Sequence, residues 1–341
     1  MSPSRPSRRT LIKLAGAGLA ADALAGVAPT AAMANAAPAK VWSAEYKAKK
    51  GDVSLYMYRK RLGAPKKGEP ARPVLFLVHG SSISSRPTFD LSVPGKGEYS
   101  LMNVFAGAGF DVWTMDHESY GRSTQTEGNS DIASGVEDLK AGTELVVRET
   151  GQQKMHLLGE SSGALRVGAF AVARPERVDR LVLMAFTYTG KGSPTLQKRA
   201  EQVEYFRTHN RRKRDREMIR SIFTRDKPGT SDPAVAEALA DAELVFGESI
   251  PTGTYLDMTA NLPVVDPTKL RAPCLVVRGE YDGIASEDDL LDFYRKLANP
   301  DRQFSILPGL AHNLSLGLNR QLFWHCARAF LEMPRPVPIT V

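Results

Sequence analysis

The segment between residues 155 and 173 constrains the fold of this chain more than any other. A short apolar run, 155–158, ends at a Gly-x-Ser-x-Gly pentapeptide centred on Ser161, and small residues of helical character follow as far as Ala173. A strand that turns sharply into a helix at this pentapeptide holds its serine on a strained turn, with the hydroxyl projecting beyond the sheet. Ordinary Gly/Ser turns share the pentapeptide, but the flanking strand and helix favour a nucleophilic role for Ser161.

Apolar and helical segments alternate along most of the chain. Continuous apolar runs such as Val74–Val78 are typical of strands buried on both faces of a parallel sheet. Strands alternating with helices predict an α/β fold with a doubly wound, mostly parallel sheet. Residues 53–59 and the region before them predict an opening antiparallel hairpin. The further expected strands are 74–78, 111–115, 155–158, 178–186, 273–279 and 303–307, and the expected helices are 99–108, 131–149, 164–173, 286–297 and 320–333.

The alternation stops between residues 187 and 268, where the sequence is charged, helical in pattern and broken by prolines. This predicts a helical cap, 187–268, inserted after the sixth strand of a core formed by 40–186 and 269–341. A chain of 341 residues is long enough for one large core with such an insertion. We expect the cap and the long loop 81–97 to border the substrate pocket. Most aromatic residues of the cap should pack within it, with one or two facing the pocket; they are Phe186, Tyr188, Tyr205, Phe206, Phe223, Phe246 and Tyr255.

The N-terminus resembles a twin-arginine export signal. Arg8 and Arg9 precede a mild Ala/Gly/Leu run, and small-residue cleavage sites follow near Ala36. Residues 1–36 are therefore predicted to be a signal peptide, with a disordered Ala-rich tail as the alternative. The run is too short and too rich in glycine for a membrane anchor. We expect a periplasmic or secreted protein whose partner during transport is the twin-arginine export machinery.

Charge and cysteine content narrow the classes of partner. The net charge of +7 includes four basic residues of the leader, and the densest basic cluster, 207–220, has few aromatics. That cluster predicts a solvated helix face; an anionic substrate or surface is a better alternative than nucleic acid. Cys274 and Cys326 lie in apolar segments, which favours two buried thiols, although a disulfide stays possible. Two cysteines cannot form a zinc cluster, and no histidine pair has metal-ligand spacing.

A serine hydroxyl needs a general base, and that base needs an orienting acid. In a sheet of this kind the order along the chain is serine, then acid, then histidine. Only His312 and His325 follow Ser161 and the cap, and His325 lies inside the last helix, where a packed structural role is expected. His312 lies in a loop just after a strand, so we predict that it is the base.

The acid should also lie in a loop just after a strand. Asp282 follows the strand that ends at Gly279, and Glu280 is its nearest rival. The acidic residues 287–289 are typical of a first helical turn, where they complement the helix dipole. We predict Asp282 as the orienting acid.

Backbone N–H groups must stabilise the oxyanion of an acyl-transfer intermediate. One donor should be Ser162, directly after the nucleophile. The other should follow the strand that ends at His79-Gly80; we predict Ser81, with Ser82 as the rival. Glu160 should face the interior beside the site, either as a structural, hydrogen-bonded group or as one that tunes the pocket.

These motifs together resemble the alpha/beta-hydrolase superfamily. The matching segments are Val78-His79-Gly80, Asp116 to Gly121-x-Ser123, Gly159-x-Ser161-x-Gly163, Arg278-Gly279-x-x-Asp282 and Gly309-x-x-His312. Two features depart from the usual pattern. Ser119 and Tyr120 stand where a glycine and a histidine are common, and no His-Gly-Gly-Gly run is present, so the second oxyanion donor rests on analogy.

The resemblance implies a serine hydrolase that needs no metal or organic cofactor. We expect a carboxylesterase acting on a small to medium ester with an apolar or aromatic part. Ser-dependent hydrolysis of a C–C bond, an amide or a lactone is the alternative, since the same triad serves each reaction. A non-catalytic binding protein on the same fold is a second alternative, because fold does not dictate function.

Overall fold

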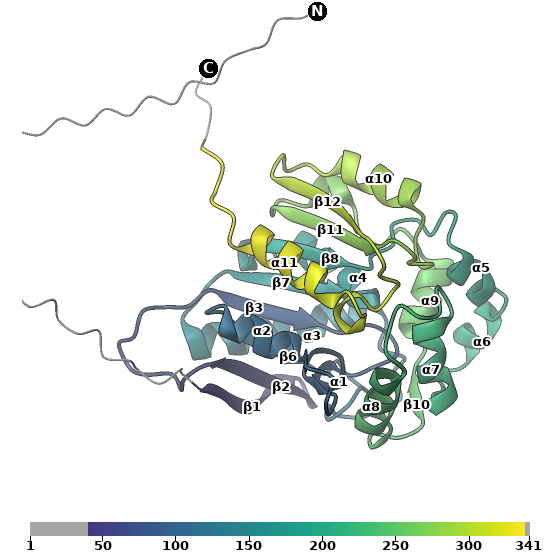
Figure 1. Cartoon of the computed structure of the whole chain (residues 1–341), viewed down its shortest axis with the longest axis horizontal. Helices are drawn as coiled ribbons and strands as arrows, with labels where there is room; N and C mark the ends of the chain where they lie inside the picture. Colours follow the sequence, from purple (N-terminus) through teal and green to yellow (C-terminus); the bar gives the residue numbers. More distant parts are fainter. Residues whose placement is uncertain (1–39, 338–341) are drawn as a thin grey trace, which may run out of the picture. The chain divides into compact units, whose positions relative to one another are not determined.

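An eight-stranded, mostly parallel sheet forms the centre of the protein (Figure 1). The computed structural model describes residues 40–337, so the predicted export signal, 1–36, lies outside the described residues. The first two strands pair antiparallel and add to one edge, as the predicted opening hairpin requires, and the other six strands run parallel. In spatial order the strands are β1 (Val41–Lys50), β2 (Val53–Leu62), β6 (Asp111–Met115), β3 (Val74–Val78), β7 (Met155–Glu160), β8 (Val178–Met184), β11 (Cys274–Gly279) and β12 (Arg302–Leu307).

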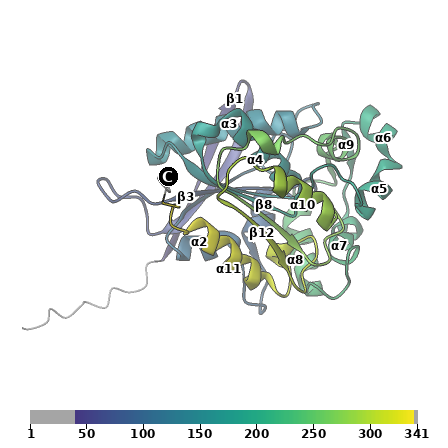
Figure 2. The same ribbon diagram turned by 90° about the horizontal axis from the view of Figure 1, so that it is seen from above.

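Both faces of the sheet are covered by helices, which explains why its central strands are continuously apolar. Along β3, Phe76 and its alternate neighbours pack in one hydrophobic cluster, whereas Leu75 and Leu77 pack in another. Figure 2 shows the two helical layers on opposite sides of the sheet. One layer contains α3 (Ile132–Thr150), α4 (Ser162–Ala173) and α10 (Glu287–Lys296), and the other contains α2 (Leu101–Gly107) and α11 (Arg320–Leu331).

The segment between β8 and β11 holds the helices expected for the cap, and they gather at one end of the sheet (Figure 1). Its elements are α5 (Pro194–Ala200), α6 (Val203–Thr208), β9 (Arg211–Lys213), α7 (Arg216–Thr224), α8 (Pro233–Leu244), β10 (Ser249–Pro251) and α9 (Gly253–Ala260). Apolar residues of α7 and α8, including Phe223 and Leu239, pack against Ile83, Leu91 and Val93 of the loop after β3. We use the name cap segment for residues 187–268.

The loop 81–97 is more ordered than the sequence suggests. It contains α1 (Ser85–Phe89) and β4 (Leu91–Ser92), and β4 pairs with β5 (Glu98–Tyr99). Its apolar residues Phe89, Leu91 and Val93 are buried in hydrophobic clusters, so they support the cap segment and the sheet and do not line the pocket.

The prediction that the basic cluster 207–220 is a solvated helix face is wrong in two respects. Residues Arg211–Lys213 form the short strand β9, which pairs with β10. Arg214 is buried and forms an ion pair with Glu243, which also accepts hydrogen bonds from the backbone N–H and Oγ of Ser84 at 3.0 and 2.6 Å. A basic residue can be buried when an acidic partner from a distant segment compensates its charge, and no local pattern reveals such a partner.

Both cysteines are free thiols, Cys274 buried in β11 and Cys326 only partly buried in α11. The disulfide that the sequence left possible is therefore not formed, and the prediction of two buried thiols holds for Cys274 alone. Within residues 40–337 no helix combines the length and apolar character that crossing a membrane requires.

Glycines allow β7, α4 and the end of β3 to approach one another closely. A Cβ atom at Gly163 would lie 2.2 Å from the carbonyl oxygen of Val78, and one at Gly159 would lie 2.3 Å from the carbonyl oxygen of Gly163. Both obstacles are backbone atoms, which no rotation of a side chain can move. The two glycines of the pentapeptide are therefore required by packing around Ser161.

Substituting Gly163 by alanine should destabilise the protein because the new methyl group meets backbone on β3. We expect the free energy of unfolding in urea to fall by about 1–3 kcal/mol or more. Gly107→Ala is the matched control: it lies at the end of α2 with open space around it, and alanine there should be neutral or stabilising by up to about 1 kcal/mol. Equal stability of Gly163→Ala and the wild type would contradict the close approach.

Candidate active site

Three side chains predicted from the sequence meet at one edge of the sheet. Ser161 follows β7, Asp282 follows β11 and His312 follows β12, and carboxyl ends of parallel strands share an edge. Ser161 Oγ lies 3.0 Å from Nε2 of His312, and Asp282 Oδ1 lies 2.9 Å from its Nδ1. The rival acid Glu280 instead accepts a hydrogen bond from the backbone N–H of Gly309 at 2.8 Å. His325, expected to be packed in the last helix, is exposed on α11.

The backbone at Ser161 is strained, as a nucleophile elbow requires. Its φ of 57° and ψ of −121° place a residue with a side chain in a region that normally favours glycine. Conformations of this kind cost on the order of 1–3 kcal/mol and persist where the surroundings enforce them. Here the backbone N–H of Ser161 donates to the carbonyl oxygen of Met184 at 2.8 Å, which fixes the turn against β8.

Asp282 is buried and holds the imidazole in one orientation. Its Oδ1 accepts hydrogen bonds from the backbone N–H of Ile284 and from Nδ1 of His312, both at 2.9 Å. Burial alone would raise the pKa of Asp282, but His312 and these hydrogen bonds outweigh it and lower the pKa below its usual value. The carboxylate therefore stays ionised, which keeps the proton on Nδ1 and leaves Nε2 as an acceptor toward Ser161.

The two predicted oxyanion residues lie side by side. Ser81 Oγ donates to Ser162 Oγ at 2.8 Å, and Ser162 is the first residue of α4, so its backbone N–H has no acceptor within the helix. A Cβ atom at Gly80 would lie 3.2 Å from Cβ of Ser161, which shows how closely this loop passes the nucleophile. The rival residue Ser82 instead contacts Tyr255, with 2.6 Å between the two hydroxyl oxygens.

Two buried aromatic side chains support this loop, and sequence reasoning assigned a role to neither. Nδ1 of His79 lies 2.8 Å from the carbonyl oxygen of Gly80, and its Nε2 accepts from the backbone N–H of His117 at 3.1 Å. Burial lowers the pKa of His79 well below its ordinary value, so the ring is neutral and its Nδ1–H donates to Gly80. Tyr120, at one of the positions that departs from the family pattern, donates its hydroxyl proton to the carbonyl oxygen of Ser81 at 2.9 Å.

Glu160 lies beside the nucleophile without a balancing charge. Its side chain is buried, borders the cavity at Ser161, and leaves Oε2 without a hydrogen-bond partner among the described residues. Burial, and to a smaller extent the charge of Asp282, raises its pKa to about 8. Glu160 is therefore mostly a neutral acid at pH 7. Of the two roles left open by the sequence, its place on the cavity wall and its unpartnered Oε2 favour a group that tunes the pocket over a hydrogen-bonded structural group.

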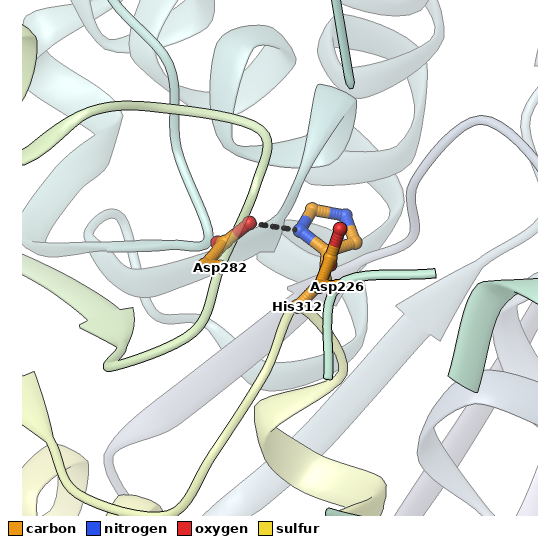
Figure 3. A group of neighbouring side chains, drawn as sticks. All are labelled: Asp226, Asp282 and His312. Carbon is orange, nitrogen blue, oxygen red and sulfur yellow. Dashed lines mark hydrogen bonds and ion pairs between the residues drawn. The ribbon is translucent and has the colours of Figure 1, made fainter. Parts of the chain in front are cut away.

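The cap segment adds a carboxylate that the sequence did not single out. Acidic and imidazole atoms of Asp226, Asp282 and His312 lie within 4.8 Å of one another (Figure 3). These residue types could hold a cation, but Nδ1 of His312 is bonded to Asp282, and Asp226 is paired with Arg225 at 3.1 Å. Both carboxylates therefore already have a protein partner, a hydrogen-bond donor for Asp282 and a guanidinium group for Asp226. The only signal in the sequence is one acidic residue in a charged segment, which does not distinguish Asp226 from its neighbours.

Two cavities adjoin the site. The smaller, about 50 Å³, is bordered by Ser161, His312, Glu160 and the Gly80–Ile83 loop. The larger, about 750 Å³, lies between the cap segment and the loop that carries Asp282. Of the aromatic residues predicted for the cap, Tyr255 borders the larger cavity, in agreement with the expectation that one or two would do so.

The sequence of this chain matches a known protein family over most of the fold just described. Residues 93–317 match the family described as serine aminopeptidase, S33, or Hydrolase_4. The chain belongs to the serine aminopeptidase S33 family. Its family and its fold are those of the alpha/beta-hydrolases.

Curated relatives of this S33-family hydrolase match over shorter segments. A 2-hydroxy-6-oxononadienedioate/2-hydroxy-6-oxononatrienedioate hydrolase of Paraburkholderia phymatum is 31% identical over 148 residues, 42% of this chain and 44% of the relative. Lipase 3 of Drosophila melanogaster is 31% identical over 129 residues, 35% of this chain and 32% of the relative. The chain thus matches less than half the length of these relatives.

A solved structure extends the similarity to nearly the whole described fold. The 2-hydroxy-6-oxo-6-phenylhexa-2,4-dienoate hydrolase of Rhodococcus sp. strain RHA1 superimposes with a TM-score of 0.62, covering 86% of this chain and all of that one. Its sequence is 20% identical to this S33-family hydrolase. At 20% identity the structural similarity supports the fold alone.

The buried acid of this hydrolase should make its stability depend on pH. Because the pKa of Glu160 is about 8 in the folded state against an ordinary 4.5, the folded protein retains a proton that the unfolded chain releases between these values. Stability therefore falls as pH rises through this range, by up to about 1.4 kcal/mol per pH unit. In Glu160→Gln this contribution disappears, and urea denaturation between pH 5 and pH 8 should show a shallower decline.

Glu149→Gln is the control, because Glu149 is exposed on α3 and forms no ion pair within residues 40–337. It should leave the pH profile of stability unchanged. Superimposable profiles for Glu160→Gln and the wild type would show that Glu160 is already charged in the folded protein.

Proposed function

We propose that this hydrolase cleaves a carboxylic ester of small to medium size through an acyl-enzyme intermediate on Ser161. The observation that carries the proposal is the unbroken series of contacts from Ser161 Oγ to His312 Nε2 and from His312 Nδ1 to Asp282. A nucleophile, a base and an orienting acid in hydrogen-bond reach are the arrangement that acyl transfer by a serine needs.

The proposed reaction begins when Nε2 of His312 takes the proton of Ser161 as Oγ attacks the acyl carbon. Asp282 stabilises the imidazolium that forms, and the backbone N–H groups of Ser81 and Ser162 stabilise the oxyanion. His312 then returns the proton to the departing alkoxide, which leaves an acyl-enzyme and a free alcohol. Water attacks the acyl-enzyme with His312 as base, releasing the acid and restoring Ser161. These steps use protein groups and water alone.

The two cavities support the proposed size of the substrate. The space of about 50 Å³ at Ser161 accommodates a small part of a ligand, and the adjoining cavity of about 750 Å³ can hold the remainder. Ligand sites typically measure about 300–1,000 Å³. The cap segment forms one wall of the larger cavity, which favours a small molecule over an open polymer surface.

Hydrolysis of a C–C bond by the same serine is the second candidate. Several relatives, from Paraburkholderia phymatum, Burkholderia vietnamiensis and Pseudomonas putida, are named as hydrolases of 2-hydroxy-6-oxononadienedioate. Their similarity to this chain is confined to part of its length, so the ester remains the leading proposal. Amide and lactone substrates use the same triad and belong in the same test.

The first experiment combines labelling with turnover. Wild-type protein should react with a fluorophosphonate at Ser161, located by peptide mapping, and should hydrolyse p-nitrophenyl esters of short acyl chains. Ser161→Ala should lose the label and at least about 10⁴-fold in turnover while staying folded, because the nucleophile acts as a unit with its base. Asp282→Asn should lose about 10⁴-fold through the wrong imidazole tautomer.

The outcomes separate the candidate functions. If the protein takes the label and hydrolyses no ester, but does hydrolyse a diketone, an amide or a lactone, the alternative reaction is identified. Folded wild-type protein that takes no label would favour a non-catalytic binding protein. Near-native turnover by Ser161→Ala would refute the assignment of the nucleophile.

We also propose that the protein is exported and acts in the periplasm or outside the cell. The support is the sequence alone, with Arg8 and Arg9 ahead of an apolar run and small-residue cleavage sites. Replacing both arginines by lysine should leave the uncleaved chain in the cytoplasm, as shown by fractionation and mass determination. Normal export of that double variant would contradict the proposal.

A further inference from the structure

The larger cavity has an uneven distribution of charge. Each carboxylate on its wall has a partner: Asp226 pairs with Arg225, Asp282 with His312, and Glu280 with the backbone N–H of Gly309. Three guanidinium groups on the wall have no carboxylate within 4 Å in the described part of the chain. That of Arg278 donates to the carbonyl oxygen of Asp282 at 2.8 Å, whereas those of Arg199 in α5 and Arg212 in β9 form no hydrogen bond with the described residues. The cavity thus has positive charge that no neighbouring side chain neutralises.

Both guanidinium groups are held over the same aromatic ring. The Cζ atoms of Arg199 and Arg212 lie 5.0 and 4.6 Å from the ring centroid of Tyr255. Tyr255 is buried and its hydroxyl contacts that of Ser82 at 2.6 Å, so the ring is fixed relative to the loop beside the nucleophile. Stacking on a fixed ring positions an arginine while leaving its N–H donors free to bind a ligand.

Holding these charges together is unfavourable in the absence of a ligand. Burial, together with Arg225 and Arg212, lowers the pKa of Arg199 to about 10, which still leaves it charged at neutral pH. Arginines outside the cavity wall have acidic partners: Arg216 and Arg220 are both paired with Glu237 on α8. An anion bound between Arg199 and Arg212 would relieve their repulsion.

The positive end of the cavity connects with the nucleophile. Arg199 borders both cavities, together with Ser82, Ile222 and Arg225, and the smaller one contains Ser161 and His312. A single molecule can therefore contact Arg199 at one end and present its reactive carbonyl group to Ser161 at the other.

We propose that Arg199 and Arg212 bind a carboxylate of the substrate, so that the bond cleaved at Ser161 belongs to a molecule that carries a second, ionised acid group. The inference rests on the proposed function and names the class of its substrate. A carboxylate fits the planar fork of a guanidinium better than other small anions, since both of its oxygens can accept in parallel.

The kinetic test uses pairs of p-nitrophenyl esters that differ by one terminal carboxylate. The mono-p-nitrophenyl esters of glutarate and adipate are compared with the neutral valerate and hexanoate esters. We expect the wild type to prefer the carboxylated members, with Arg199→Gln and Arg212→Gln each lowering kcat/KM for those members about 10- to 100-fold, mainly through KM. The neutral esters are the internal reference: the ratio of kcat/KM for a carboxylated ester to that for its neutral counterpart should fall in both variants.

A binding test separates the subsite from the reaction. Glutarate should bind the Ser161→Ala protein in calorimetry, and adding Arg199→Gln and Arg212→Gln should abolish the heat signal. Arg220→Gln is the control, because Arg220 is exposed, paired with Glu237 and not among the residues that line the cavity. It should alter neither binding nor kinetics.

The two tests fail in different ways. If glutarate binds in a way that depends on the two arginines but no ester is hydrolysed, the subsite stands and the proposed ester reaction is overturned. Ester turnover with no preference for a terminal carboxylate, or glutarate binding unaffected by both substitutions, would overturn the subsite and leave the reaction standing.

Discussion

The active site depends on a backbone contact between α4 and the end of β3. At Gly163 this contact leaves no room for a Cβ atom, because that atom would lie only 2.2 Å from the carbonyl oxygen of Val78. The same approach brings the Ser81 loop beside Ser162 and places Ser161 in its strained conformation. Proximity of two chain segments, and not any single polar contact, therefore brings the nucleophile and the proposed oxyanion donors together.

The sequence predicted the fold and the meeting of Ser161, Asp282 and His312 because both follow from local patterns. Buried strands such as β3 are continuously apolar, and Ser161, Asp282 and His312 each follow a strand in the expected order. Contacts between distant segments could not be predicted in this way. The burial of Arg214 depends on Glu243, which lies 29 residues further along the chain in α8. The closeness of Asp226 to His312 depends on how the cap segment packs. Neither has a periodic or motif signal.

Reactivity and recognition come from different parts of the chain. Ser161, Asp282 and His312 follow core strands, whereas Arg199 and Arg212 lie in the cap segment. The cap segment contacts the core through apolar packing and through Glu243, whose charge is balanced by Arg214 of the same segment. Glu243 also binds the backbone of Ser84, only three residues from Ser81. The position of the cap segment is thus linked to the loop beside the nucleophile, so that side chains for binding can change while the chemistry is retained.

The pairing of β8 with β11 has a consequence for folding. These neighbouring strands align Leu181 with Cys274, yet the whole cap segment separates them along the chain. Closing so long a loop has an entropic cost that must be met before the strand contacts form, and such non-local pairs tend to form slowly. Asp282 and His312 both lie beyond this junction, whereas Ser161 lies before it. During refolding the serine elbow can therefore form ahead of its partners, and catalytic activity should be among the last native properties to return.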